Sequence, residues 1–305
     1  MIKFIYFNLI FFALSLLPQL MFGQQQESTL PLEDRIKKII NDAGGKIGVG
    51  VQGMDFKGGF IINGDHRYPM MSVFKFPLAL AILNKVDKGE IKINQMFHIP
   101  KETLDNKTWS PMVADFPNQD LDISLVDLLT YTVSKSDNNA CDFLYTKVAG
   151  SPAAVNQYIH DSGIKGISIV YTEGEMEKDW ALQYKNWCKP AASLQLLQLL
   201  YNQKLLSKAS NDFLIKIMRE EPVWGKRITV LLPSETELIH KTGSSGVNSE
   251  GITAAFNDIG IITLPSGKHL AISIFMSDFK APKERGVNVI AAISKEVFDY
   301  YAKKH

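Results

Sequence analysis

Ser72 and Lys75 stand three residues apart in the segment "MMSVFKFPLALAIL", where an apolar helical run begins. One turn of helix would place the hydroxyl and the amine on the same face. A serine hydroxyl is a weak nucleophile at neutral pH and needs such a neighbouring base. The pair therefore predicts a nucleophile with its activator, and the competing interpretation is a helix N-cap beside a surface lysine. The same spacing occurs in two other pairs, which we interpret as surface residues: Ser162/Lys165 and Ser277/Lys280.

Two further polar motifs follow along the chain, Ser136-Asp137-Asn138 and Lys241-Thr242-Gly243. Each has a plain structural alternative, since the first could cap the next helix and Lys241 could be an exposed strand residue. Three motifs in this order are far rarer by chance than any one of them alone. The ordered set indicates acyl transfer to a serine.

With these motifs the sequence resembles the class A serine β-lactamases, nearest to the branch of extended-spectrum cephalosporinases, from about Leu32 to the C-terminus. The resemblance implies that Ser72 is the nucleophile that opens the lactam ring and that Lys75 activates it. It also implies that Ser136 passes a proton to the departing nitrogen. Asn138 would then hold Lys75 and the amide side chain of the substrate.

The resemblance further implies groups that bind the charges of the substrate. Lys241 and Thr242 would bind its carboxylate. The backbone N–H groups at the helix start beside Ser72 and at Ser244 would form the oxyanion hole. Gly243, which lacks a Cβ, would allow a close approach there.

Hydrolysis also needs a base that activates water against the acyl ester, which in class A enzymes is a glutamate in an R-x-E-x-x-L-N loop. The corresponding stretch, "IVYTEGEMEKDWALQYKNW", has no such arginine, and Met176 and Glu177 stand where leucine and asparagine are usual. Glu173, Glu175 and Glu177 compete for the role. The E-x-x-M form of the branch selects Glu173. Whether Lys75 or Glu173 takes the serine proton during acylation stays open.

Two more residues follow from the resemblance. Trp109, in "KTWSP", would form an aromatic wall beside the substrate, and the alternative is a packing residue. Many class A enzymes carry an arginine on the strand after Lys-Thr-Gly, but "SSGVNSEGITAAF" has none. Arg227, in "WGKRITVLLP", could fill the same space, and the alternative is a surface arginine.

Composition narrows the classes of function. The chain has 305 residues, of which 46% are hydrophobic, and a formal net charge of +1, so it can bury a sizeable core. A charge this close to zero argues against nucleic acid as the main partner. The six histidines are scattered, without metal-ligand spacing, so we expect no metal and no other cofactor.

The N-terminal stretch reads as a targeting segment. A short basic start, an apolar run and Gly23 predict a signal peptide over residues 1–23, and the alternative is an uncleaved anchor. We therefore expect export to the periplasm and no stable membrane association after cleavage. For Cys141 and Cys188 we favour two free, buried thiols over a disulfide.

The elements that must position these residues form an α/β (α+β) pattern. A helix and two strands come first, a long helical block follows, and three strands and a closing amphipathic helix end the chain. This order predicts a β-lactamase/D,D-peptidase-like fold: a five-stranded antiparallel sheet flanked by the terminal helices, plus an all-α lobe, with the active site at the seam. We expect one domain over 24–305, with an α/β lobe at about 24–70 and 220–305 and the all-α lobe at about 71–219.

The sequence thus predicts a monomeric enzyme that hydrolyses small-molecule β-lactams, with cephalosporins preferred. Two alternatives stay open. Penicillin-binding D,D-peptidases share the three motifs but retain the acyl group, and a non-catalytic protein could bind cell-wall peptides at the same place.

Overall fold

The computed structural model describes residues 30–220 and 225–305. The predicted signal peptide, residues 1–23, lies outside the described residues.

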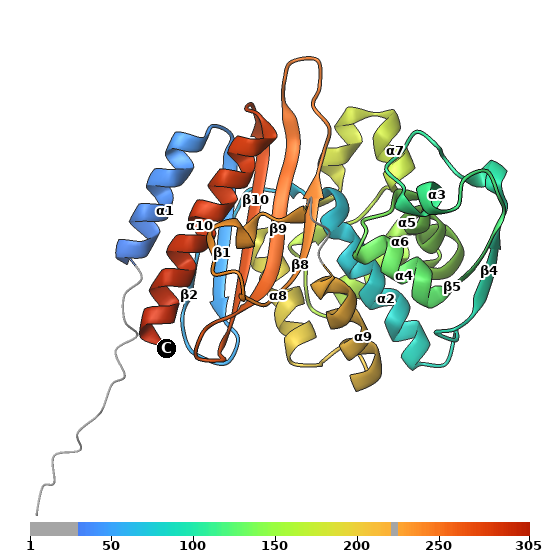
Figure 1. Ribbon diagram of the computed structural model, residues 1–305, viewed down its shortest axis with the longest axis horizontal. Coiled ribbons are helices and arrows are strands. Elements are labelled where there is room, and N and C mark those ends of the chain that lie inside the picture. Colours follow the sequence, from blue (N-terminus) through green and yellow to red (C-terminus); the bar gives the residue numbers. More distant parts are fainter. Residues whose placement is uncertain (1–29, 221–224) are drawn as a thin grey trace, which may run out of the picture.

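A five-stranded sheet organises the fold (Figure 1). Its strands lie in the order β2-β1-β10-β9-β8, and every neighbouring pair is antiparallel. The strands are β1 (Lys46–Gly53), β2 (Gly59–Ile62), β8 (Leu238–Ser244), β9 (Thr253–Thr263) and β10 (His269–Phe279). The predicted sheet is therefore confirmed, with the strands from the two ends of the chain paired through β1 and β10.

The terminal helices α1 (Leu30–Ala43) and α10 (Lys283–Lys304) pack together on one face of this sheet (Figure 1). The other face of β1 and β10 is covered by α8 (Pro190–Tyr201). The fold has two hydrophobic cores, one on each face of the sheet, and β10 contributes to both. Its Ile272 and Ile274 pack in the core beneath the terminal helices, whereas Phe275 packs in the core shared with the helical block. Because both faces are covered, the central strands are buried almost without interruption.

The helical block surrounds α2 (Lys75–Asp87), in which every residue from 75 to 83 is buried. Its other helices are α3 (Pro111–Asp115), α4 (Leu125–Val133), α5 (Asn138–Phe143), the π-turn Leu144–Ala149, α6 (Pro152–Asp161), α7 (Glu173–Lys178) and α9 (Lys208–Arg219). Two small sheets join its loops: β3 (Tyr68–Pro69), β7 (Trp187–Cys188) and β6 (Ile167–Ser168), and β4 (Met96–Ile99) with β5 (Leu121–Ser124). Short 3-10 helices lie at Met71–Phe74, Lys101–Thr103, Trp180–Lys185 and Ile228–Leu231.

The other two Ser-x-x-Lys pairs lie away from α2. Ser277 is fully buried in β10, where its Oγ lies 3.1 Å from His66 Nε2, so the surface interpretation is wrong for this serine. Ser162 ends α6 and donates to the carbonyl of Tyr158, while Lys165 is exposed.

Both cysteines are buried as free thiols, Cys141 in α5 and Cys188 in β7. Burial raises the pKa of each thiol above its ordinary value. The preference for two free thiols is therefore confirmed.

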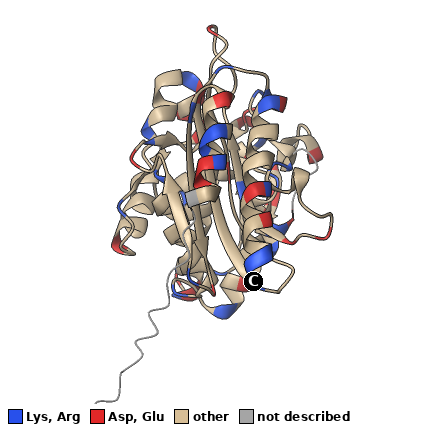
Figure 2. Cartoon of the chain, turned by 90° about the vertical axis from the view of Figure 1, so that its left-hand side faces the viewer, with Lys and Arg blue, Asp and Glu red and all other residues tan. Residues whose placement is uncertain are grey.

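Charge on the face formed by the terminal helices is mixed. Lys and Arg are interspersed with Asp and Glu on this side (Figure 2), as a net charge of +1 suggests. No helix within residues 30–220 and 225–305 has both the length and the apolar character needed to cross a bilayer.

Candidate active site

Ser72 lies on a tight turn that precedes α2. It belongs to the 3-10 helix Met71–Phe74, and α2 begins only at Lys75. Met71 has a φ of 43°, in the left-handed region that is strained for a residue with a side chain. Met70 and Phe74 occupy the two N-cap positions, so the interpretation of Ser72 as an N-cap is wrong.

A residue of the five-stranded sheet fixes the turn that carries Ser72. Asn257 of β9 is fully buried, and its Nδ2 donates to the carbonyls of Pro69 and Met70 at 2.8 and 3.0 Å. Its Oδ1 accepts from the Met276 N–H. A Cβ on Gly243 would stand 2.3 Å from the Met70 carbonyl oxygen, so only glycine permits β8 to lie this close. Asn257 carries no motif, and sequence reasoning missed it.

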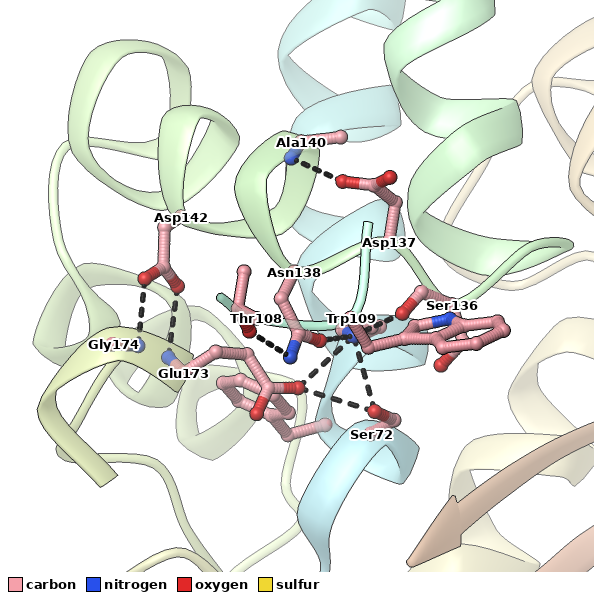
Figure 3. Close-up of polar contacts among 12 residues, drawn as sticks. Ser72, Thr108, Trp109, Ser136, Asp137, Asn138, Ala140, Asp142, Glu173 and Gly174 are labelled. Atoms are coloured by element: carbon pink, nitrogen blue, oxygen red, sulfur yellow. Dashed lines mark hydrogen bonds and ion pairs between the residues drawn. The ribbon is translucent and has the colours of Figure 1, made fainter. Parts of the chain in front are cut away.

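Lys75 is the polar centre of the site (Figure 3 shows the surrounding groups). Its ammonium group is fully buried and donates to Ser72 Oγ at 3.0 Å. It also donates to the Ser136 carbonyl at 2.7 Å and to Asn138 Oδ1 at 2.6 Å. Glu173 Oε1 lies 3.0 Å from the same nitrogen. These contacts compensate the buried charge with an ion pair and hydrogen bonds.

Glu173 is the carboxylate that meets the serine. It is the first residue of α7, it is buried, and its Oε1 accepts from Ser72 Oγ at 3.1 Å. Glu175 instead closes a capping box with Thr172, and Glu177 accepts from Thr108. Of the three competing acids, Glu173 therefore has the position that activation of water at Ser72 requires.

Asp142 fixes the backbone at Glu173. Its two carboxylate oxygens accept from the Glu173 and Gly174 N–H groups, each at 2.8 Å (Figure 3). Burial raises the pKa of Asp142 to about 6, with the negative charge of Glu173 adding to the rise and the two N–H donors opposing it. Asn186 fixes the preceding stretch, because its Oδ1 accepts from the Val170 and Tyr171 N–H groups. Sequence reasoning missed both residues, since neither belongs to a motif.

Ser136 and Lys241 meet across the seam between the helical block and the sheet. Lys241 is buried, and its ammonium donates to Ser136 Oγ at 3.0 Å. The interpretation of Lys241 as an exposed strand residue is therefore wrong. Asp137 does cap α5, because its Oδ1 accepts from the Ala140 N–H at 2.8 Å (Figure 3). The Ser136-Asp137-Asn138 motif thus has a structural role at its middle residue and faces the cleft with its outer two.

Positive charge gathers at the β8 end of the site. Arg227 is buried and donates to the Asn257 carbonyl at 2.6 Å and to Ser244 Oγ at 3.4 Å, so the surface alternative is wrong for this arginine. Burial, with the nearby charges of Lys75 and Arg227, lowers the pKa of Lys241 to about 7. This end of the site is suited to an anionic group.

A buried hydrogen bond between His240 and Asp258 supports this end of the site. Asp258 of β9 accepts from His240 Nδ1 at 2.9 Å and, through its other oxygen, from the Ile228 N–H at 3.4 Å. It therefore links the strand that carries Lys241 to the turn that carries Arg227.

These groups open onto a cleft of about 700 Å³. Trp109 stands at its rim, 52% exposed, and its Nε1 donates to the Lys135 carbonyl. The exposure argues against a packing residue. The cleft is also lined by Ser72, Thr108, Ser136, Asn138, Glu173, Met176, Glu177, Arg227, Thr242, Gly243, Ser244 and Phe256. The structure thus brings all eleven predicted site residues to one place.

Comparison with known proteins gives consistent results. Residues 31–301 match the profile described as the Beta-lactamase enzyme family. The chain is 40% identical over 293 residues to Beta-lactamase VEB-1 from Pseudomonas aeruginosa, covering 95% of this chain and 96% of that protein. It is 34% identical over 273 residues to Extended-spectrum beta-lactamase PER-1 from the same organism, covering 90% and 88%.

Solved structures give the same result. The crystal structure of TLA-1 extended spectrum β-lactamase superimposes with a TM-score of 0.87 and 44% identity, covering 90% of this chain and 99% of that one. A class A β-lactamase from Bacteroides cellulosilyticus has a TM-score of 0.85 and 35% identity, covering 90% and 98%.

Proposed function

Because the chain belongs to the β-lactamase enzyme family, as a class A serine enzyme near its extended-spectrum branch, we propose that Ser72 carries the acyl group during β-lactam hydrolysis. Two hydrogen bonds at Ser72 Oγ support this assignment. Lys75 Nζ donates to this oxygen at 3.0 Å, and the hydroxyl donates to Glu173 Oε1 at 3.1 Å. A hydroxyl held between an ammonium and a carboxylate is positioned to lose its proton as it attacks a carbonyl.

The hydrogen bonds favour one direction for that proton. Lys75 has three N–H groups, and the Ser136 carbonyl and Asn138 Oδ1, which can only accept, occupy two of them. The third N–H faces Ser72 Oγ and Glu173 Oε1. We therefore propose that the Ser72 proton passes to Glu173, while the Lys75 charge stabilises the alkoxide that develops.

Ring opening and deacylation follow from the same groups. Ser136 Oγ, which accepts from Lys241, would deliver a proton to the departing ring nitrogen. The proton that Glu173 took from Ser72 would replace, within the cleft, the one that Ser136 gives up, which leaves Glu173 ionised again. Glu173 would then remove a proton from the water that attacks the ester on Ser72, and the Ser72 oxygen would regain a proton as the ester bond breaks. The backbone N–H groups of Ser72 and Ser244 would hold the carbonyl oxygen during both steps.

The cationic end of the cleft would bind the carboxylate that β-lactams carry beside the ring nitrogen. Thr242 and Ser244 line this end, and Arg227 donates to Ser244 Oγ. Lys241, on the same strand, is buried and donates to Ser136 Oγ, which lines the cleft. We further propose that cephalosporins are preferred, in keeping with the extended-spectrum relatives, that the protein acts as a monomer, and that it is exported to the periplasm after loss of residues 1–23.

A full progress curve with a chromogenic cephalosporin in large excess tests the function. We expect many turnovers per enzyme molecule and a higher kcat/KM than for benzylpenicillin. A burst of one equivalent followed by a plateau would instead favour a penicillin-binding D,D-peptidase. No colour and no covalent adduct would favour a non-catalytic peptide-binding protein.

The pH dependence of kcat/KM should show the titration of Lys241. Its pKa of about 7 in the free enzyme means that the ammonium is charged below that pH and neutral above it. The attraction for the substrate carboxylate is therefore lost as pH rises, and kcat/KM should fall up to about tenfold per pH unit above pH 7. Binding of the carboxylate raises this pKa, so kcat should fall only at higher pH.

In K241R the guanidinium stays charged, and the alkaline limb of the kcat/KM profile should move beyond pH ~9. If kcat/KM of K241R fell above the same pH as in the unmodified protein, the assignment of this limb to Lys241 would be contradicted.

A further inference from the structure

Charge is unevenly distributed in the cleft, whose lining also includes Lys107 and Lys283. Lys241 and Arg227 lie at the β8 end, whereas Glu173 and Glu177 approach from α7 at the other end. Glu173 is buried and already paired with Lys75, but Glu177 is exposed on the wall of the cleft. Four residues along a helix bring the two carboxylates to the same face.

The Glu177 carboxylate is held in place and has one oxygen open to a ligand. Its Oε1 accepts from Thr108 Oγ1 and, at 3.4 Å, from Asn138 Nδ2. Asn138 Nδ2 also donates to Thr108 Oγ1 at 2.8 Å, which closes a small network (Figure 3 shows Thr108 beside Asn138). In the described part of the chain no group donates to Oε2, and no lysine or arginine nitrogen lies within 4 Å of the carboxylate.

The orientation of a substrate follows from the mechanism proposed above, on which this inference rests. With the lactam carbonyl at Ser72 and the ring carboxylate towards Lys241, the amide side chain must leave the ring on the opposite side. Asn138, Thr108 and Glu177 line that side of the cleft.

We propose that Glu177 is a specificity-determining residue that favours β-lactams whose amide side chain carries a positive charge and disfavours those whose side chain carries a negative one. An ammonium on the carbon next to the side-chain carbonyl can donate to Glu177 Oε2, and a carboxylate at the same carbon is repelled. Because Glu177 is exposed, solvent screens the interaction, and the effect is a matter of a few-fold.

Three penicillins that differ at this one carbon test the inference. Ampicillin carries an ammonium there, benzylpenicillin carries hydrogen and carbenicillin carries a carboxylate. Values of kcat/KM are measured at about pH 6, below the ordinary pKa of an α-amino group, for the unmodified protein, E177Q and E175Q. Glutamine at 177 keeps an acceptor for Thr108 and Asn138. E175Q removes the same charge from the same helix, and glutamine can keep the capping box.

Relative to benzylpenicillin, E177Q should lose about threefold to fivefold for ampicillin and gain a similar factor for carbenicillin. E175Q should change neither ratio, and high salt should shrink both effects in the unmodified protein. An equal loss for all three substrates, or unchanged ratios, would overturn the inference alone. Failure of the unmodified protein to turn over any of the three would overturn the proposed mechanism and this inference with it.

Discussion

Replacing Glu173 by glutamine should give a protein that reacts with one β-lactam molecule and then stops. The amide keeps the size of the side chain but cannot take a proton from water, so deacylation should slow by about 10²–10⁴-fold. With benzylpenicillin, mass spectrometry should show Ser72 carrying the mass of the whole antibiotic, since opening of the ring expels nothing. Steady-state turnover should fall by the same factor.

E175Q and E177Q are the matched controls for E173Q. The carboxylates at these positions contact Thr172 and Thr108, so both variants should turn over many molecules of benzylpenicillin. Turnover by E173Q at the unmodified rate would place the base elsewhere. The adduct should also form more slowly in E173Q than in the unmodified protein, because the proposed mechanism passes the Ser72 proton to Glu173. Adduct formation at the unmodified rate would instead point to Lys75 as the base in acylation.

Replacing Lys75 by methionine should prevent the adduct from forming. Methionine retains most of the length of the side chain but has no ammonium to stabilise the developing alkoxide, so acylation of Ser72 should slow by about 10²–10⁴-fold. Stopped-flow or quenched mass spectrometry should find no burst. E173Q should thus accumulate the acyl-enzyme and K75M should not form it, a difference that steady-state rates alone cannot reveal.

K75M must also be tested for folding. It leaves the Glu173 carboxylate and the Asn138 and Ser136 oxygens buried without their cation, and loss of one partner of such a pair destabilises proteins by about 3–5 kcal/mol. We expect a lower Tm, so adduct formation is measured well below it, with circular dichroism confirming the fold. A full burst in folded K75M would contradict a role for the amine in acylation.

The sequence predicted those parts of the site that rest on ordered motifs or on periodic patterns. The order of strands and helices indicated the five-stranded sheet, because alternation and helical periodicity reflect burial directly. The three motifs led to Ser72, Lys75 and Lys241, and resemblance selected Glu173 among three acids.

The rest could not be predicted, because it depends on contacts with backbone groups far away in the chain. Asn257 and Asp142 act through carbonyls and N–H groups, and any residue type offers those. The strained turn at Met71 lies close against β8 at Gly243, and no local pattern reveals this contact. The interpretation of Ser277 as a surface residue was wrong because both faces of β10 are covered. The serine is therefore buried, and its Oγ is hydrogen-bonded to His66.

The two buried thiols have a consequence for how the enzyme matures. Cys141 and Cys188 remain unpaired, so the fold owes nothing to cross-linking and would form equally in an oxidising or a reducing compartment. A thiol must ionise and reach solvent before oxidants attack it readily, and burial opposes both for these two residues. The activity should therefore be indifferent to dithiothreitol and to mild peroxide, and a host without disulfide-forming enzymes would still produce it in full.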